Sequence, residues 1–97
     1  MDEPKQMPIK ATDEVLKGVY SNMAQISHTP EEFVVDFLSV YPPAGNLVSR
    51  VIVNPGHMKR IVAALTDNLT KYEKQFGPIK MTAGPEASTA PIGFDAK

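Results

Sequence analysis

The chain has 97 residues, which is the size of one small domain. Its 10 basic residues (Lys and Arg) nearly balance 11 acidic ones (Asp and Glu), so the net charge of -1 gives no bulk attraction to nucleic acid or to an anionic membrane. The absence of cysteine excludes disulfide frameworks and thiol nucleophiles. An acidic start and the lack of any apolar run of roughly 18 residues predict a cytoplasmic protein without a signal peptide or membrane span.

The two ends of the chain differ in composition from its middle. Residues 1–14 and 80–97 are rich in proline, charged residues and small polar residues, and such segments bury too little apolar area to offset the cost of ordering them. We therefore predict two disordered tails around a single α+β domain at residues 15–79. Phe94 is the one aromatic residue in either tail, and it is either a docking anchor for a partner or a solvated residue.

Three segments of the domain have the alternation, or the β-branched and aromatic content, that is typical of strands. In chain order they are Val19–His28, Phe33–Tyr41 and Leu47–Val53. Pro30 interrupts the first connection, where the spacing of Thr29 and Glu32 matches a capping box and predicts a short helical corner. Residues 42–46 form the second connection as a turn. Because both connections are short, we predict a three-stranded antiparallel meander.

A complete set of helix signals follows the third strand. Asn54 is the expected N-cap, Pro55 the first helical residue, Gly77 the residue just past the end and Pro78 the stop. Between them, apolar residues at spacings of three and four form one stripe: Met58, Ile61, Val62, Leu65, Leu69, Tyr72 and Phe76. The prediction is therefore an α+β fold, β-β-β-α, in which one long amphipathic helix lies across the sheet.

The second and third strands are apolar on both faces, and a single helix can cover only one of them. A large exposed apolar patch is rare on a soluble monomer. The second face is therefore our candidate oligomer or partner surface, and it comprises Val34, Leu38, Val40, Val48 and Ile52. We expect a homodimer that stacks sheets, extends them edge to edge or pairs helices. Alternatively, a tail or the corner after the first strand folds back over that face.

Residues for catalysis or metal binding are sparse. His28 and His57 are the only histidines and lack metal-ligand spacing, and a triad of Ser49, His57 and Asp36 would have no nucleophile elbow. The helix start at residues 54–57 either holds an anion or serves only as a cap. We therefore expect no enzymatic activity, no cofactor, no metal and no small-molecule substrate.

Three stretches of the chain resemble a family of short prokaryotic proteins, and they are residues 19–22, 27–37 and 48–60. The most specific of these are Ser-His-Thr-Pro-Glu-Glu-Phe at 27–33 and the helix start Asn-Pro-Gly-His at 54–57. The family is catalogued as domain of unknown function 3467, and the resemblance runs from Val19 to Ile79. It implies a β-rich half followed by a long helix in a small cytoplasmic bacterial or archaeal protein, and it implies no activity. In outline, strands followed by a helix are also similar to SecB-type export chaperones.

Two functions from different classes fit these expectations. The first is a non-enzymatic, oligomeric protein-interaction module, of which a chaperone-like holdase or an adaptor is a special case. The alternative is a small nucleic-acid-binding protein that uses a sheet-plus-helix surface, with Arg50, Lys59 and Arg60 as candidate anion or phosphate contacts.

Overall fold

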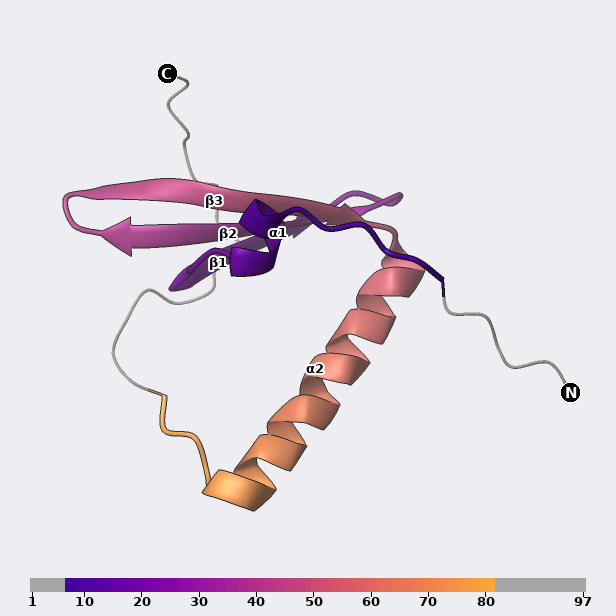
Figure 1. Cartoon of the computed structure of the whole chain (residues 1–97), viewed down its shortest axis with the longest axis vertical. Helices are drawn as coiled ribbons and strands as arrows, with labels where there is room; N and C mark the ends of the chain where they lie inside the picture. The colour runs from indigo at the N-terminus through magenta and orange to yellow at the C-terminus, as the bar shows by residue number, and fades with distance from the viewer. Residues whose placement is uncertain (1–6, 82–97) are drawn as a thin grey trace, which may run out of the picture.

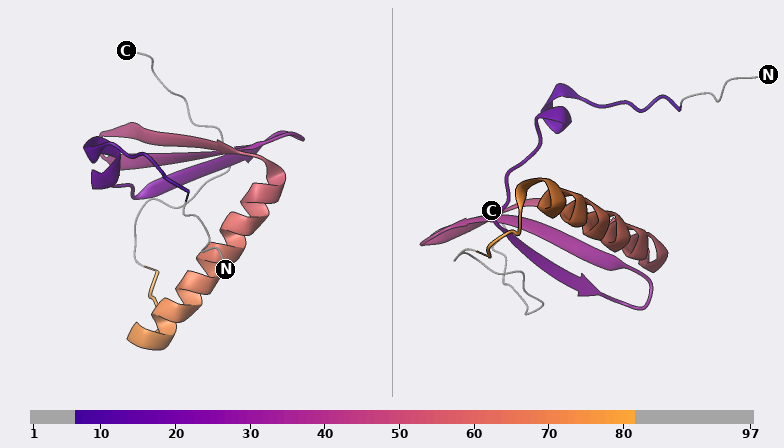
Figure 2. Two further views of the ribbon diagram at one scale, coloured as in Figure 1. Left: turned by 45° about the vertical axis from the view of Figure 1, so that its right-hand side comes forward. Right: turned by 90° about the horizontal axis from the view of Figure 1, so that it is seen from below.

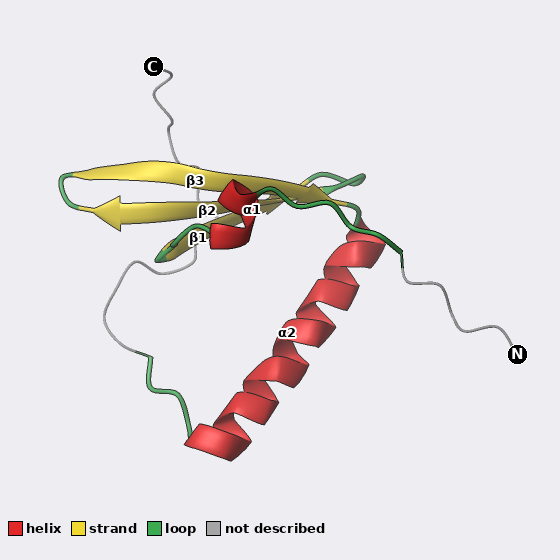
Figure 3. Cartoon of the chain, viewed as in Figure 1, coloured by secondary structure: helices red, strands yellow, loops and turns green. Residues whose placement is uncertain are grey.

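The computed structural model describes residues 7–81 and consists of a three-stranded sheet followed by a long helix (Figure 1, Figure 3). Its elements are α1 (Asp13–Lys17), β1 (Met23–His28), β2 (Phe33–Tyr41), β3 (Ala44–Val53) and α2 (Pro55–Phe76). The strand order is β1-β2-β3 with both pairings antiparallel, which confirms the predicted meander and the α+β class. Most of the two expected tails, Phe94 included, lies outside the described residues.

A short helix, α1, stands where the sequence analysis placed the boundary between tail and domain. The Thr12 hydroxyl accepts a hydrogen bond from the Val15 N–H at 3.2 Å, and the acidic Asp13 and Glu14 occupy the first turn, where the helix dipole favours them. Gly18 ends the helix with a positive φ of 77°. No residue of α1 is buried, so its caps hold it rather than packing. A helix this short has no apolar periodicity from which it could be predicted.

Side chains add to the backbone pairing at the start of β1, where the Asn22 N–H donates to the Leu38 carbonyl at 3.0 Å. The Asn22 amide nitrogen donates to the Val40 carbonyl at 2.9 Å, and its amide oxygen accepts from the Val40 N–H at 2.8 Å. The Ser21 hydroxyl donates to the carbonyl oxygens of Met23 (2.8 Å) and Leu38 (2.9 Å). Asn22 therefore extends the ladder in place of a strand residue, and β1 begins later than predicted.

The connection between β1 and β2 is a bend and not the predicted helical corner. Thr29 does act as a local cap, because its hydroxyl accepts from the N–H groups of Glu31 (3.2 Å) and Glu32 (3.3 Å). However, the Thr29 N–H donates to the Glu32 carbonyl at 2.9 Å, which returns the chain to the sheet before a helical turn forms. At the other end of β2 only two prolines precede β3, so β3 begins earlier than predicted.

The pairing of β2 with β3 contains a bulge. Phe37 is paired with Ser49, whereas Leu38 is paired with Leu47, so Val48 is the extra residue. A bulge changes the alternation of every residue beyond it. Leu47 therefore lies on the same face as Leu38, whereas strict alternation along β3 from Val51 would put it on the opposite face.

The caps of α2 are those that the sequence predicts. The Asn54 side-chain oxygen accepts from the His57 N–H at 2.7 Å, Pro55 is the first helical residue, and Gly77 ends the helix with a φ of 93°. From the end of β3 the helix runs away from the sheet at an open angle, as Figure 1 and Figure 2 show. None of its residues is buried. The expectation that α2 covers one face of the sheet is therefore wrong.

The hydrogen bonds of Asn22 provide a test of how the sheet is held. Replacing Asn22 with Ala removes two part-buried hydrogen bonds to Val40, so we expect the free energy of unfolding to fall by about 2 kcal/mol. Urea denaturation at fixed protein concentration measures it. The control is Asn46→Ala, an exposed position in β3, for which we expect a change below about 0.5 kcal/mol. Equal losses in the two variants would contradict the role assigned to Asn22.

Candidate interaction surface

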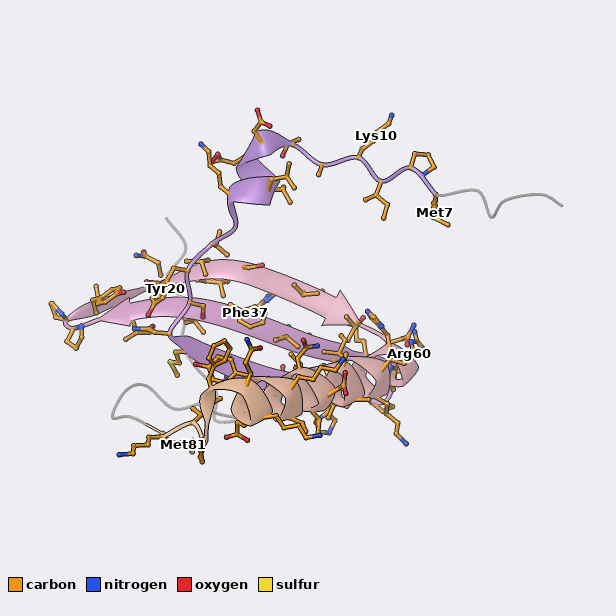
Figure 4. All side chains as sticks on the ribbon, turned by 60° about the horizontal axis from the view of Figure 1, so that its bottom comes forward. Met7, Lys10, Tyr20, Phe37, Arg60 and Met81 are labelled. Carbon is orange, nitrogen blue, oxygen red and sulfur yellow. The ribbon has the colours of Figure 1, made fainter. Side chains whose placement is uncertain are left out.

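An apolar wedge opens between α2 and one face of the sheet. Phe33, Val35 and Phe37 alternate onto this face, and Ile26 and Val51 flank Val35 in the pairing of the three strands. Figure 4 shows Phe37 on the sheet face that is turned toward α2. We define the wedge by its residues: Ile26, Phe33, Val35, Phe37 and Val51 from the sheet, and Met58, Val62, Leu65, Leu69, Tyr72 and Phe76 from α2.

The narrow end of the wedge is a groove where α2 leaves the sheet. It has a volume of about 470 Å³ and is lined by Phe33, Pro55, Gly56, Met58, Lys59 and Val62. The lining is almost entirely apolar, because Lys59 is its only charged residue. The wide end of the wedge carries the aromatic pair Tyr72 and Phe76, whose ring centroids lie 4.9 Å apart. The two ends of the helix thus present a cavity and a pair of large rings.

The wedge is exposed to a degree that a stable monomer rarely tolerates. From Val62 to Phe76 its helix residues are 49% to 65% exposed, and Ile26, Phe37 and Val51 are 37% to 43% exposed. Together these side chains offer on the order of 800 Å² of apolar surface, which is about what each partner contributes to a standard protein interface. Buried apolar side chains in the described part of the chain are Leu38 and Val53 alone. The wedge is therefore the candidate interaction surface of the described domain.

The helix side of the wedge follows a heptad pattern. Met58, Val62, Leu65, Leu69, Tyr72 and Phe76 are separated by four and three residues in alternation, and Ile61 widens the stripe near the start of the helix. Such alternation is typical of the seam of a two-stranded coiled coil. Arg60, Asp67 and Lys74 occupy the outward heptad position. The prediction that this stripe packs on the sheet is not met, because α2 leaves the sheet at an open angle and has no buried residue.

The predicted partner surface lies on the opposite face of the sheet. Val34, Leu38 and Val40 alternate onto that face, Ile52 is paired with Val34, and Val48 lies in the bulge beside them. Leu38 is buried and Ile52 is 55% exposed, while the other three are half-buried. The structure thus places the five residues side by side on β2 and β3, but the larger exposed apolar surface is the wedge.

An ion pair between a buried carboxylate and a half-exposed arginine crosses the middle of this opposite face. Asp36 and Arg50 are directly paired across the strands, and the Arg50 Nε and Nη2 atoms donate to the two carboxylate oxygens at 2.7 and 2.9 Å. The Asp36 side chain is only 6% exposed. The hydrogen bond to Asp36, together with its negative charge, raises the pKa of Arg50 above its ordinary value. The guanidinium is therefore committed to neutralising a buried carboxylate.

The three candidate phosphate contacts do not form one site. Arg50 projects from the face opposite the wedge, while Lys59 lines the groove on the wedge side. Arg60 lies at the same end of α2 as Lys59, as Figure 4 shows. A strip of basic residues along one surface is what a nucleic-acid backbone requires. Arg50 lies on the other face of the sheet from Lys59 and is bound to Asp36, so the three residues do not form such a strip.

Catalytic and metal-binding groups are likewise dispersed. Ser49 is paired with Phe37 and lies on the wedge face, whereas Asp36 is on the opposite face and bound to Arg50, so the triad with His57 is not assembled. The His28 ring lies 5.4 Å from the Phe33 ring. Within residues 7–81 no three potential metal ligands cluster. Neither α1 nor α2 is both long and apolar enough to span a membrane.

Comparison with known proteins gives one match. The family described as "Protein of unknown function (DUF3467)" matches residues 1–81. No curated protein and no solved structure matches the chain. The match covers the whole sheet, α2 and the residues of the wedge, so the surfaces described above lie within the family's domain.

The ion pair between Asp36 and Arg50 predicts an asymmetric response to neutral substitutions. Arg50→Met leaves a buried carboxylate without its cation, so we expect a lower urea midpoint of unfolding. Arg60→Met makes the same chemical change at an exposed position and is expected to leave the midpoint nearly unchanged. If both variants shift the midpoint equally, the pair has no special role in holding the sheet.

Proposed function

The chain belongs to the DUF3467 family of proteins of unknown function, and we propose that it is a non-enzymatic protein-interaction module that works as a homodimer. In the dimer, a second copy fills the wedge, and the outer faces and edges of the two sheets remain available to a partner protein. The exposed heptad seam of α2 carries this proposal. A seam of this kind is built to be covered by another helix.

A second copy of the chain is the occupant that the wedge favours. Small domains with little buried core generally need oligomerisation, a disulfide or a bound metal for stability. The described part of this chain buries only Leu38 and Val53 among its apolar residues. A second copy supplies an identical seam at the same concentration, and closed symmetric dimers are the commonest solution. The area of the wedge also matches what one partner of a stable interface buries.

The proposal favours an adaptor over a chaperone-like holdase. A holdase needs free apolar surface for unfolded clients, but the second copy occupies the largest such surface of this chain. The remaining apolar residues, Val34, Val40, Val48 and Ile52, form a smaller patch beside the polar pair of Asp36 and Arg50. The outer edges of β1 and β3 have no neighbouring strand in the three-stranded sheet. An extended segment of a partner protein can pair with such an edge.

The first test of the proposal is the mass of the protein in solution. Light scattering on a size-exclusion column is expected to give a dimer across a dilution series. Leu69→Asp places a charge in the middle of the seam and should weaken the dimer by about 100-fold or more. Ala63→Asp introduces the same charge outside the seam and should change the dissociation constant less than about threefold. A monomeric wild-type chain at all concentrations would contradict the proposal.

The nucleic-acid alternative has its own test. Because Arg50 is bound to Asp36 and the net charge is -1, we expect single-stranded oligonucleotides at low salt to bind no more tightly than about 0.1 mM, the weak end of non-specific binding. Fluorescence anisotropy of a labelled oligonucleotide measures it. Micromolar binding that weakens steeply with added salt, and that Lys59→Ala reduces, would favour the alternative instead.

A further inference from the structure

We infer that the two copies pair their α2 helices antiparallel, in the register that places Leu65 against the partner's Leu69. This inference rests on the proposed function, because it specifies how the second copy fills the wedge. It is carried by the sizes of the seam residues, by the groove at one end of the wedge, and by the two charges that flank the seam.

The sizes of the seam residues fit an antiparallel pair. In this register Met58 faces the partner's Phe76, Val62 faces the partner's Tyr72, and the two leucine layers lie at the centre. Each outer layer therefore combines a smaller residue with a larger one, and the helices remain evenly spaced. A parallel pair would instead stack two tyrosines and two phenylalanines at one end and the smaller residues at the other.

The groove at the narrow end of the wedge fits the aromatic pair. Tyr72 and Phe76 lie side by side and are 49% and 65% exposed. The antiparallel register brings them to the partner's groove, which is lined by the equivalents of Phe33, Met58 and Val62. At about 470 Å³ that groove is within the range in which proteins enclose apolar groups, roughly 300–1,000 Å³. Each chain thus has the aromatic pair at one end of α2 and the groove that can accept the partner's pair at the other end.

Two charges beside the seam set the same orientation. Lys59 and Glu73 share the heptad position that follows Met58 and Tyr72, and residues at this position face each other across an antiparallel pair. Lys59 therefore lies next to the partner's Glu73, and the two-fold symmetry creates the contact twice. In a parallel pair the same charges would be about 21 Å apart along the seam, since 14 residues separate them.

Neither charge has an ionic partner within its own chain among residues 7–81. The ion pairs there are Glu14–Lys17, Asp36–Arg50 and Asp67–Lys71. One carboxylate oxygen of Glu73 accepts from the Ile79 N–H at 2.9 Å, which leaves the other oxygen for the cross-chain contact. The dipole of α2 favours the reverse placement of the two charges, with the acid near the start and the base near the end. The stability of the isolated helix therefore does not explain why Lys59 lies near its start and Glu73 near its end.

Charge reversal on the full-length chain tests the register. Lys59→Glu and Glu73→Lys each turn two attractive contacts into repulsive ones, so each should weaken the dimer about tenfold. The double variant restores both contacts and should return to within about threefold of wild type. Lys74→Glu reverses a charge on the outward position of the same helix and should change the dissociation constant less than about threefold. Sedimentation equilibrium gives the dissociation constants of the wild type and the four variants.

The outcomes separate the register from the dimer itself. A stable dimer that is indifferent to both single variants, or a double variant weaker than either, overturns the antiparallel register and leaves the proposed dimer standing. A wild-type chain that is monomeric overturns the proposed function instead. Rescue in the double variant supports both the dimer and its antiparallel register. Each single substitution places a charge that the dipole of α2 favours, so a weaker dimer in the single variants does not come from a weaker helix.

A disulfide test on the cysteine-free chain gives an independent answer. In the antiparallel register the two copies of Thr66 meet near the two-fold axis, so Thr66→Cys should oxidise to a covalent dimer. Val62→Cys should not, because it faces the partner's Tyr72. In a parallel pair Val62 would face its own equivalent and the result would reverse. Non-reducing gels after mild oxidation read out both variants, and a covalent dimer from Val62→Cys with none from Thr66→Cys would overturn the inference.

Discussion

The exposed seam of α2 is the feature on which the rest of the structure depends. A helix that leaves the sheet at an open angle exposes its own apolar side and also uncovers the sheet face beneath it (Figure 2). Because hydrophobic burial is the dominant favourable term in folding, a chain with Leu38 and Val53 as its buried apolar residues within the described range has little to offset its conformational entropy. In the proposed dimer, the wedge is the part of the core that the second copy completes.

The opposite face of the sheet carries an ion pair that depends on the strand register. Asp36 and Arg50 lie at its centre, in direct register across β2 and β3, and their bidentate contact requires that register. A slip by one residue would move Asp36 to the apolar wedge face and leave its charge unpaired. The ion pair therefore favours the observed strand register, and it makes this face partly polar.

The fold was readable from the sequence wherever a local signal agreed with the periodicity. Asn54, Pro55 and Gly77 mark the ends of α2 because each supplies a hydrogen bond or a backbone conformation that helix ends require. The predictions of strand faces and strand ends fail where contacts between strands determine the structure. The bulge at Val48 changes the face on which Leu47 lies, and the Asn22 side chain bonds to Val40 where a strand residue was predicted. The predicted surface around Leu38 and Ile52 stays a prediction, and the wedge is a second candidate surface that periodicity alone did not indicate. An apolar stripe indicates that a helix is covered, but the direction in which the helix leaves the sheet determines what covers it.

If a second copy completes the core, folding and association are one equilibrium. The apparent stability then rises with protein concentration, because the folded state is favoured by mass action as well as by its own contacts. The outer edges of β1 and β3 and the face that carries Asp36 would be well ordered only in the dimer, so a partner that binds there would recognise the assembled state. Such a partner would in turn stabilise the dimer by the same free energy by which dimerisation strengthens its binding. In this arrangement the wedge controls the interaction without contacting the partner.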